Sequence, residues 1–138
     1  MLPLRTGVNK LIPMTGNKVL LDTNIVSALL KGEISIADKI DLAEQVYVPN
    51  VVIGELHYGA QYSSRIKKNI EKIIDFSERY DILKIDATTA ATYGRLKAAL
   101  RKKGKPIPEN DIWIAALAEQ YQLPLATRDR HLTKLKIF

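Results

Sequence analysis

Hydrophobic positions along the chain alternate between two spacings. Short segments rich in apolar residues have the length of buried strands, and they lie at Lys18–Leu21, Val46–Val48, Asp81–Ile85 and Leu123–Ala126. Between them, apolar residues recur every three to four positions, as they do in amphipathic helices. This alternation predicts an α/β fold in three layers, with a central parallel sheet covered by helices on both faces.

The helical spacing and its boundary residues predict where the helices lie. The predicted helices span Thr23–Lys31, Ile34–Glu44, Val51–Tyr62, a segment from Ser63 or Ser64 to about Arg79, Ala87–Lys103 and Asn110–Gln122. Asn50 is a plausible N-cap for the third of these, and Ser63 or Ser64 for the fourth. Residues 1–17 are predicted to be an extension because Pro and Gly interrupt any periodicity, so the domain is expected to span 18–138, with a last short strand at Lys136–Phe138.

Four acidic residues stand close to places where predicted elements begin. Asp22 follows the first strand, and Asp129 follows the fourth. Glu55 lies in the second turn of the helix after the second strand, and Asp111 lies in the first turn of the helix after Pro108. In a parallel sheet, the carboxyl ends of the strands lie at the edge where ligands bind. The positions therefore predict an acidic pocket at the carboxyl ends of the strands.

Such a pocket needs a counter-charge. Two carboxylates about 4 Å apart repel each other by about 4 kcal/mol at an effective dielectric constant near 20, whereas a helix amino terminus offsets only about 0.3–1 kcal/mol. Either one acid holds a proton or a cation binds. Mg²⁺ or Mn²⁺ suits a site made of carboxylates and commonly acts on phosphates. The pattern therefore indicates hydrolysis of a phosphate ester by a metal-bound water.

Each acid also has a purely structural interpretation. Asp22 and Asp111 could be helix N-caps and nothing more. Glu55 could be a solvated helix residue, and Asp129 could belong to an Asx turn. The catalytic interpretation depends on the occurrence of all four acids together.

Composition narrows the possible partners and surroundings. The chain has 138 residues, is 46% hydrophobic, carries a formal charge of +6 and has no cysteine. Cysteine-based zinc sites and disulfides are thereby excluded, and we expect a cytoplasmic protein without a membrane span or secretory signal. The positive charge suits a polyanionic partner such as RNA, although it could serve solubility alone. One basic run before the Asp111 segment is a candidate for RNA phosphate contacts: Arg101, Lys102, Lys103 and Lys105.

The histidines and aromatic residues are predicted to have no catalytic role. His57 lies two residues from Glu55, so the two side chains point in different directions on a helix. A metal-free ribonuclease mechanism that uses His57 and His131 is conceivable, but both are interpreted as ordinary polar residues. Trp113 and the tyrosines are predicted to pack within the fold rather than to stack on bases.

Four short motifs occur in a fixed order between Lys18 and His131. They read LDTN at 21–24, ELHYG at 55–59, PIPENDIWIAA at 106–116 and LATRDRH at 125–131. Each motif alone would be weak, but together they resemble PIN-domain ribonucleases, and more closely the VapC toxins of toxin–antitoxin pairs. The resemblance implies a PIN-like fold and an endoribonuclease that depends on Mg²⁺ or Mn²⁺.

The resemblance also assigns roles to individual residues and partners. It implies that Asp22 and Asp111 are the most direct metal ligands, that Asp129 is a further ligand, and that Glu55 acts through water or a second metal. Two further positions match residues that support the acids by hydrogen bonds: Asn24 and Thr127. The family additionally implies a homodimer and a cognate antitoxin that covers the acidic site.

Three other classes of protein fit the sequence less well. A receiver domain would have an acidic pair after the first strand and a late Lys, whereas Thr23 and Asn24 follow Asp22 and the late position holds Asp129. A haloacid-dehalogenase-type phosphatase would have a second Asp where Asn24 stands. A non-catalytic basic RNA-binding module remains an alternative, but it leaves the four acids unexplained.

Overall fold

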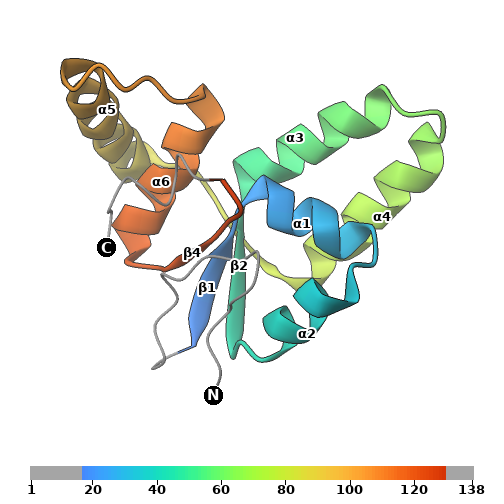
Figure 1. Cartoon of the computed structure of the whole chain (residues 1–138). Helices are drawn as coiled ribbons and strands as arrows, with labels where there is room; N and C mark the ends of the chain where they lie inside the picture. The colour runs from blue at the N-terminus through green and yellow to red at the C-terminus, as the bar shows by residue number, and fades with distance from the viewer. Residues whose placement is uncertain (1–16, 130–138) are drawn as a thin grey trace.

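The computed structural model describes residues 17–129, and four parallel strands form its central sheet (Figure 1). The strands are β1 (Lys18–Leu21), β2 (Gln45–Pro49), β3 (Asp81–Leu83) and β4 (Leu125–Ala126). Their spatial order is β3-β2-β1-β4, with β1 pairing to β2 on one side and to β4 on the other. The predicted parallel sheet is confirmed. The strand predicted at Lys136–Phe138 lies outside the described residues, as does the predicted extension up to residue 16.

Helices cover both faces of this sheet. In the part of the chain that the structure describes, they are α1 (Thr23–Leu30), α2 (Ile34–Asp41), α3 (Asn50–Gln61), α4 (Ile66–Arg79), α5 (Ala87–Lys102) and α6 (Glu109–Tyr121). In Figure 1, α5 and α6 lie on one side of the sheet and α1 to α4 on the other. The three-layer α/β/α arrangement is therefore as predicted, although α2 ends at Asp41 rather than at Glu44.

The core explains why β1 is a continuous apolar run. Val19, Leu20 and Leu21 are all buried because helices cover both faces of the strand. On α6, Ile114, Leu117 and three alanines are fully buried, and the small alanine side chains allow a close approach to the sheet. Burying one Leu or Ile side chain contributes about 1.5–3 kcal/mol. We therefore attribute the position of α6, and of the acid in its first turn, mainly to this apolar contact.

Two predicted helix caps are wrong. Asn50 is the first residue of α3, and Pro49 takes the N-cap position. Pro49 is still part of β2, so the helix begins directly where the strand ends. Ser63 does not cap α4: its hydroxyl donates to the carbonyl oxygen of Ala60 at 2.6 Å and so closes α3 instead. The N-cap position of α4 is Arg65.

The aromatic residues include a packed pair and an exposed pair. Trp113 of α6 stacks on Tyr93 of α5 with ring centroids 3.8 Å apart and an interplanar angle of 8°, which confirms the packing prediction for Trp113. Tyr58 and Tyr62 of α3 contact each other edge to face, but they are 67% and 79% exposed. The packing prediction is therefore wrong for these two tyrosines, because their face of α3 points away from the core. None of the helices within residues 17–129 is long and apolar enough to cross a membrane.

Candidate active site

The edge where β1 and β4 end brings distant parts of the chain together. The backbone N–H of Asp22 donates to the carbonyl oxygen of Ala126 at 3.0 Å, so the residues that follow the two strands are neighbours. Asp22 is only 2% exposed, and Thr127 is equally buried. A carboxylate at such a position needs hydrogen-bond donors, because burial without them is costly.

Asp22 receives those donors from three residues. Its Oδ1 accepts the backbone N–H of Thr23 at 2.7 Å, which confirms the N-cap interpretation for α1. Its Oδ2 accepts the hydroxyl of Thr127 at 2.5 Å and the side-chain amide of Asn24 at 3.3 Å. Asn24 and Thr127 thus both hydrogen-bond to the carboxylate of Asp22.

The same two residues hold the loop that carries Asp129. The hydroxyl of Thr127 accepts the backbone N–H of Asp129 at 2.9 Å, and Oδ1 of Asn24 accepts the backbone N–H of Arg128 at 3.1 Å. The guanidinium of Arg128 also pairs with Glu33 before α2. The hydroxyl of Thr127 therefore helps to fix the loop around Asp129. The hydrogen bond from Arg128 to Asn24 attaches this loop to the start of α1.

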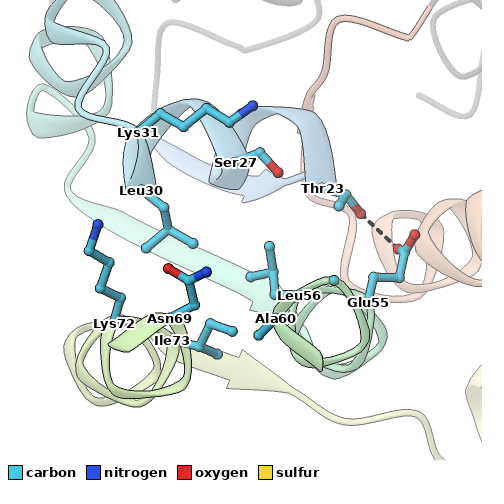
Figure 2. A pocket seen from close by; sticks show the side chains of 11 residues that line it. Thr23, Ser27, Leu30, Lys31, Glu55, Leu56, Ala60, Asn69, Lys72 and Ile73 are labelled. Carbon is cyan, nitrogen blue, oxygen red and sulfur yellow. Dashed lines mark hydrogen bonds between the residues drawn. The ribbon is translucent and has the colours of Figure 1, made fainter. Parts of the chain in front are cut away.

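Glu55 joins the site through a residue that the sequence analysis missed. The hydroxyl of Thr23 donates to Oε1 of Glu55 at 2.8 Å, as the dashed line in Figure 2 shows. Thr23 and Glu55 are 32 positions apart, on α1 and α3. A hydroxyl directly after Asp22 was the only available sequence signal, and it did not reveal which acid it would contact.

Asp111 lies inside α6 and not at its cap. The N-cap position is Pro108, and the helix begins at Glu109, so the N-cap interpretation of Asp111 is wrong. Burial is the largest cause that raises the pKa of Asp111, from its usual 3.8 to about 7. A side-chain hydrogen bond with Asp129 raises this pKa further, as do the charges of Asp22, Asp129 and Glu55. Asp111 is thus close enough to the other three acids to sense each of them.

The pKa of Asp22 is also raised, and its main cause is burial. The hydrogen bonds from Thr127 and Thr23 lower this pKa in part, while the charges of Asp129 and Glu55 raise it. We call Asp22, Glu55, Asp111 and Asp129 the acidic cluster. Its members come from four different segments, and the charges of the other three all raise the pKa of Asp111.

The donor chemistry of the acidic cluster fits a hard divalent cation. The acidic cluster offers carboxylate oxygens as ligands, which Mg²⁺ and Mn²⁺ prefer. The negative charges of the neighbouring acids raise the pKa of Asp111, and a bound cation would relieve the same repulsion. Among residues 17–129, however, no group of three or more acids and histidines is arranged so that it could hold a metal ion as it stands. Thr127 and Thr23 donate hydrogen bonds to oxygens of Asp22 and Glu55.

The basic run and the two histidines complete the candidate residues. The basic run is exposed along the end of α5 and the loop that leads to α6, and it comprises Arg101, Lys102, Lys103 and Lys105. His57 is half-buried on α3. His131 lies outside the described residues. The basic run therefore adjoins the helix that carries Asp111, as the sequence order predicted.

A groove opens beside Glu55, between α1, α3 and α4 (Figure 2). Its volume is about 440 Å³, within the range of sites that bind small molecules or peptide side chains. Its middle is apolar, with Leu30, Leu56 and Ile73 pointing into it. Thr23 and Glu55 stand at one end, so an occupant of this groove, which we call the α1–α3–α4 groove, would reach the acidic cluster.

Known proteins share both the sequence and the fold. The family described as PIN domain matches residues 19–137, a range that contains all four acids. Ribonuclease VapC2 of Haemophilus influenzae is 40% identical over 114 residues, covering 81% of this chain and 86% of that protein. Toxin FitB of Neisseria gonorrhoeae is 34% identical over 124 residues, covering 80% and 87%. The structure of VapBC2 from Rickettsia felis bound to a DNA fragment from their promoter matches with a TM-score of 0.74 and 28% identity, covering 78% of this chain and 84% of that chain.

Proposed function

Because the chain belongs to the PIN-domain family, we propose that it is an endoribonuclease whose acidic cluster cleaves RNA with a divalent metal ion. The single observation that carries this proposal is the meeting of Asp22, Glu55, Asp111 and Asp129 at one edge of the sheet. If these acids served only to cap helices or form turns, each could do so at its own element. Such roles would not require four like charges close to one another. Its ribonuclease relative of 40% identity supports the same reaction.

The four acids are assigned different roles according to their surroundings. Asp22, Asp111 and Asp129 would hold Mg²⁺ or Mn²⁺, and Glu55 stands beside them through its hydrogen bond to Thr23. When bound, the ion supplies positive charge for phosphate oxygens and lowers the pKa of a bound water. The protein's own contribution is to keep Asp22 in one orientation and to release the proton of Asp111 when positive charge arrives.

Substrate binding is assigned to the basic surface next to α6. Arg101, Lys102, Lys103 and Lys105 are exposed, and their charge would attract RNA phosphates toward the helix that carries Asp111. Arg101 also lines a groove of about 410 Å³ between the end of α5 and the start of α6. Each phosphate contact of this kind releases counterions, so binding should weaken steeply with salt.

We further propose that the chain is the toxin of a toxin–antitoxin pair and acts in the cytoplasm, where its RNA substrate is. Its relative FitB is named a toxin, and the apolar α1–α3–α4 groove offers an antitoxin a place to bind beside Glu55. The exposed Tyr58 and Tyr62 on α3 are the candidate contact of a homodimer. Sedimentation of the Tyr58→Ser/Tyr62→Ser variant as a monomer, beside a dimeric wild type, would support that contact.

A cleavage assay tests the proposed activity. Purified protein is incubated with a panel of structured RNAs in Mg²⁺, in Mn²⁺ or in EDTA, and Asp22→Asn and Asp111→Asn are compared with wild type. We expect both variants to lose about 100-fold or more in rate, as is common when a charge-stabilising group is removed. Asp38→Asn, an exposed acid on α2, is the matched control and should cleave normally.

Three results would contradict the proposal in different ways. Undiminished cleavage by both Asp22→Asn and Asp111→Asn would remove the acidic cluster from the reaction. RNA binding without cleavage under any metal would favour the non-catalytic RNA-binding module. Trapping of an acyl phosphate would favour the receiver class.

A further inference from the structure

The α1–α3–α4 groove has opposite charges at its two ends. Glu55 and Thr23 lie at one end, and Lys31, at the C-cap of α1, and Lys72 of α4 line the groove away from that end; in Figure 2 the side chain of Lys31 runs back along α1. Both lysines are exposed, so their ammonium groups are available to an occupant. Lys31 is also the C-cap residue of α1, where the helix dipole favours a cation. We call Lys31 and Lys72 the lysine end of the groove.

The floor between these ends is apolar. Ile73 and Ala60 are only 3% and 4% exposed, and Leu30 and Leu56 extend toward the middle of the groove in Figure 2. Asn69 and Ser27 add a few polar atoms along the walls. An occupant therefore needs apolar groups in its middle and polar or charged groups only at its ends.

The length of the groove can be taken from α1, which runs along it. Thr23 and Lys31 are eight residues apart, which corresponds to roughly 12 Å at 1.5 Å per helical residue. This distance equals about two turns of a bound helix or about four residues of an extended peptide. A peptide can place a cation, apolar side chains and a carboxylate within that length. Single-stranded RNA is a poorer match, because its phosphates would meet Glu55 and its sugars the apolar floor.

We propose that Lys31 and Lys72 recognise a carboxylate side chain of the protein partner that occupies the groove, and so select the partner and set its chain direction. This inference rests on the proposed function, in which an antitoxin covers the acidic cluster. The partner segment carries an Arg or Lys facing Glu55, apolar residues facing Leu56 and Ile73, and an Asp or Glu at the lysine end. Exposed ion pairs are individually weak, so the lysine end contributes mainly to the choice among partners that all fill the apolar middle.

Selection from a library of displayed random 16-residue peptides tests this inference. The full chain is the bait, and the Lys31→Glu/Lys72→Glu variant is a second bait. We expect wild type to enrich peptides with a basic and an acidic residue about two helical turns apart. The variant should instead enrich peptides with a basic residue at the position of the acid. The dissociation constant of the best wild-type peptide should rise about tenfold on the variant, equivalent to about 1.4 kcal/mol.

The controls separate this inference from changes in folding or net charge. Lys67→Glu/Lys68→Glu changes the charge by the same amount on exposed positions of α4 outside the groove, and it should keep the affinity within about twofold. Replacing the peptide's acid with Lys should restore binding to Lys31→Glu/Lys72→Glu, which a misfolded variant could not do.

Several outcomes would overturn the inference. Failure to enrich any peptide, enriched peptides without a shared acid, or equal affinity for wild type and Lys31→Glu/Lys72→Glu would each do so. Displacement of the peptide by a single-stranded RNA whose own binding requires Lys31 and Lys72 would show that the groove binds RNA instead. RNA cleavage is measured on the same proteins, so a failure of the lysine end with intact cleavage remains distinct from a failure of the proposed nuclease activity.

Discussion

Replacing Asp111 with Asn would separate the electrostatic cost of the acidic cluster from its catalytic use. The amide has nearly the shape of the carboxyl group, and it can still donate a hydrogen bond to Asp129. The substitution therefore removes one negative charge while the packing of α6 is retained. In the metal-free protein we expect Asp111→Asn to be more stable than wild type near pH 8, although it should be inactive.

The size of this effect follows from the pKa of Asp111. The difference between the usual 3.8 and about 7 corresponds to about 4 kcal/mol at 1.36 kcal/mol per pKa unit. Because Asp111 is partly exposed, solvent screening reduces this to about 1–2 kcal/mol. A carboxyl group whose pKa is raised by folding destabilises the folded state as pH rises from 3.8 through about 7, and the full cost is present above that range. The gain from Asp111→Asn should therefore be absent near pH 4 and complete near pH 8.

Urea unfolding in EDTA at pH 4, 6 and 8 measures this gain, with Asp38→Asn as the control that should show no such pH trend. Adding Mn²⁺ should stabilise wild type more than Asp111→Asn, because a cation that binds only the folded state adds stability in proportion to the logarithm of its affinity. If Asp111→Asn were no more stable than wild type at pH 8, burial and the charges of Asp22, Asp129 and Glu55 would not raise the pKa of Asp111, and the reasoning would be refuted.

Three further predictions concern the same cluster. Thr127→Val should lower the free energy of unfolding by about 2 kcal/mol in urea titrations and should slow cleavage, because the buried carboxylate of Asp22 loses its hydroxyl donor; an unchanged unfolding midpoint would contradict this. Thr23→Val should leave the fold intact by circular dichroism but reduce cleavage, because Glu55 loses its fixed position. Thr23→Ser keeps the hydroxyl and should cleave as wild type does. If Thr23→Ser were as slow as Thr23→Val, the hydroxyl would not be what positions Glu55. Cleavage at low Mn²⁺ should fall as pH drops below about 7, because Asp111 binds a proton in competition with the cation, and this loss should be reversed by more Mn²⁺; a pH-independent requirement for Mn²⁺ would contradict the competition.

Those parts of the site that depend on local sequence could be predicted. The run Val19–Leu21 is apolar at every position because both faces of β1 are covered, and an Asp directly after it must lie at the end of the sheet. The same argument placed Asp129 after β4. For these two acids the order of strand, acid and turn was sufficient to predict their common edge.

Contacts between distant helices could not be predicted. The hydrogen bond from Thr23 to Glu55 depends on how α1 packs against α3, and no local sequence pattern determines the angle between these two helices. The exposure of Tyr58 was missed for a related reason, because the spacing of apolar residues on α3 does not reveal which face another element covers. The start of α6 was predicted one residue late, since Pro108 provides a helix entry that needs no capping side chain.

The shortness of β4 has a consequence for the time at which the site is assembled. This strand contains only Leu125 and Ala126 and lies at the edge of the sheet that residues 17–129 form, yet it delivers Thr127 to Asp22, its partner 105 positions earlier. During synthesis, a chain that has emerged only through α6 holds three of the four acids but lacks the loop that orients them. The proposed site can therefore form only after β4 has been synthesised, and we expect local fraying of this two-residue strand to disturb the orientation of Asp22 while the other described elements stay folded.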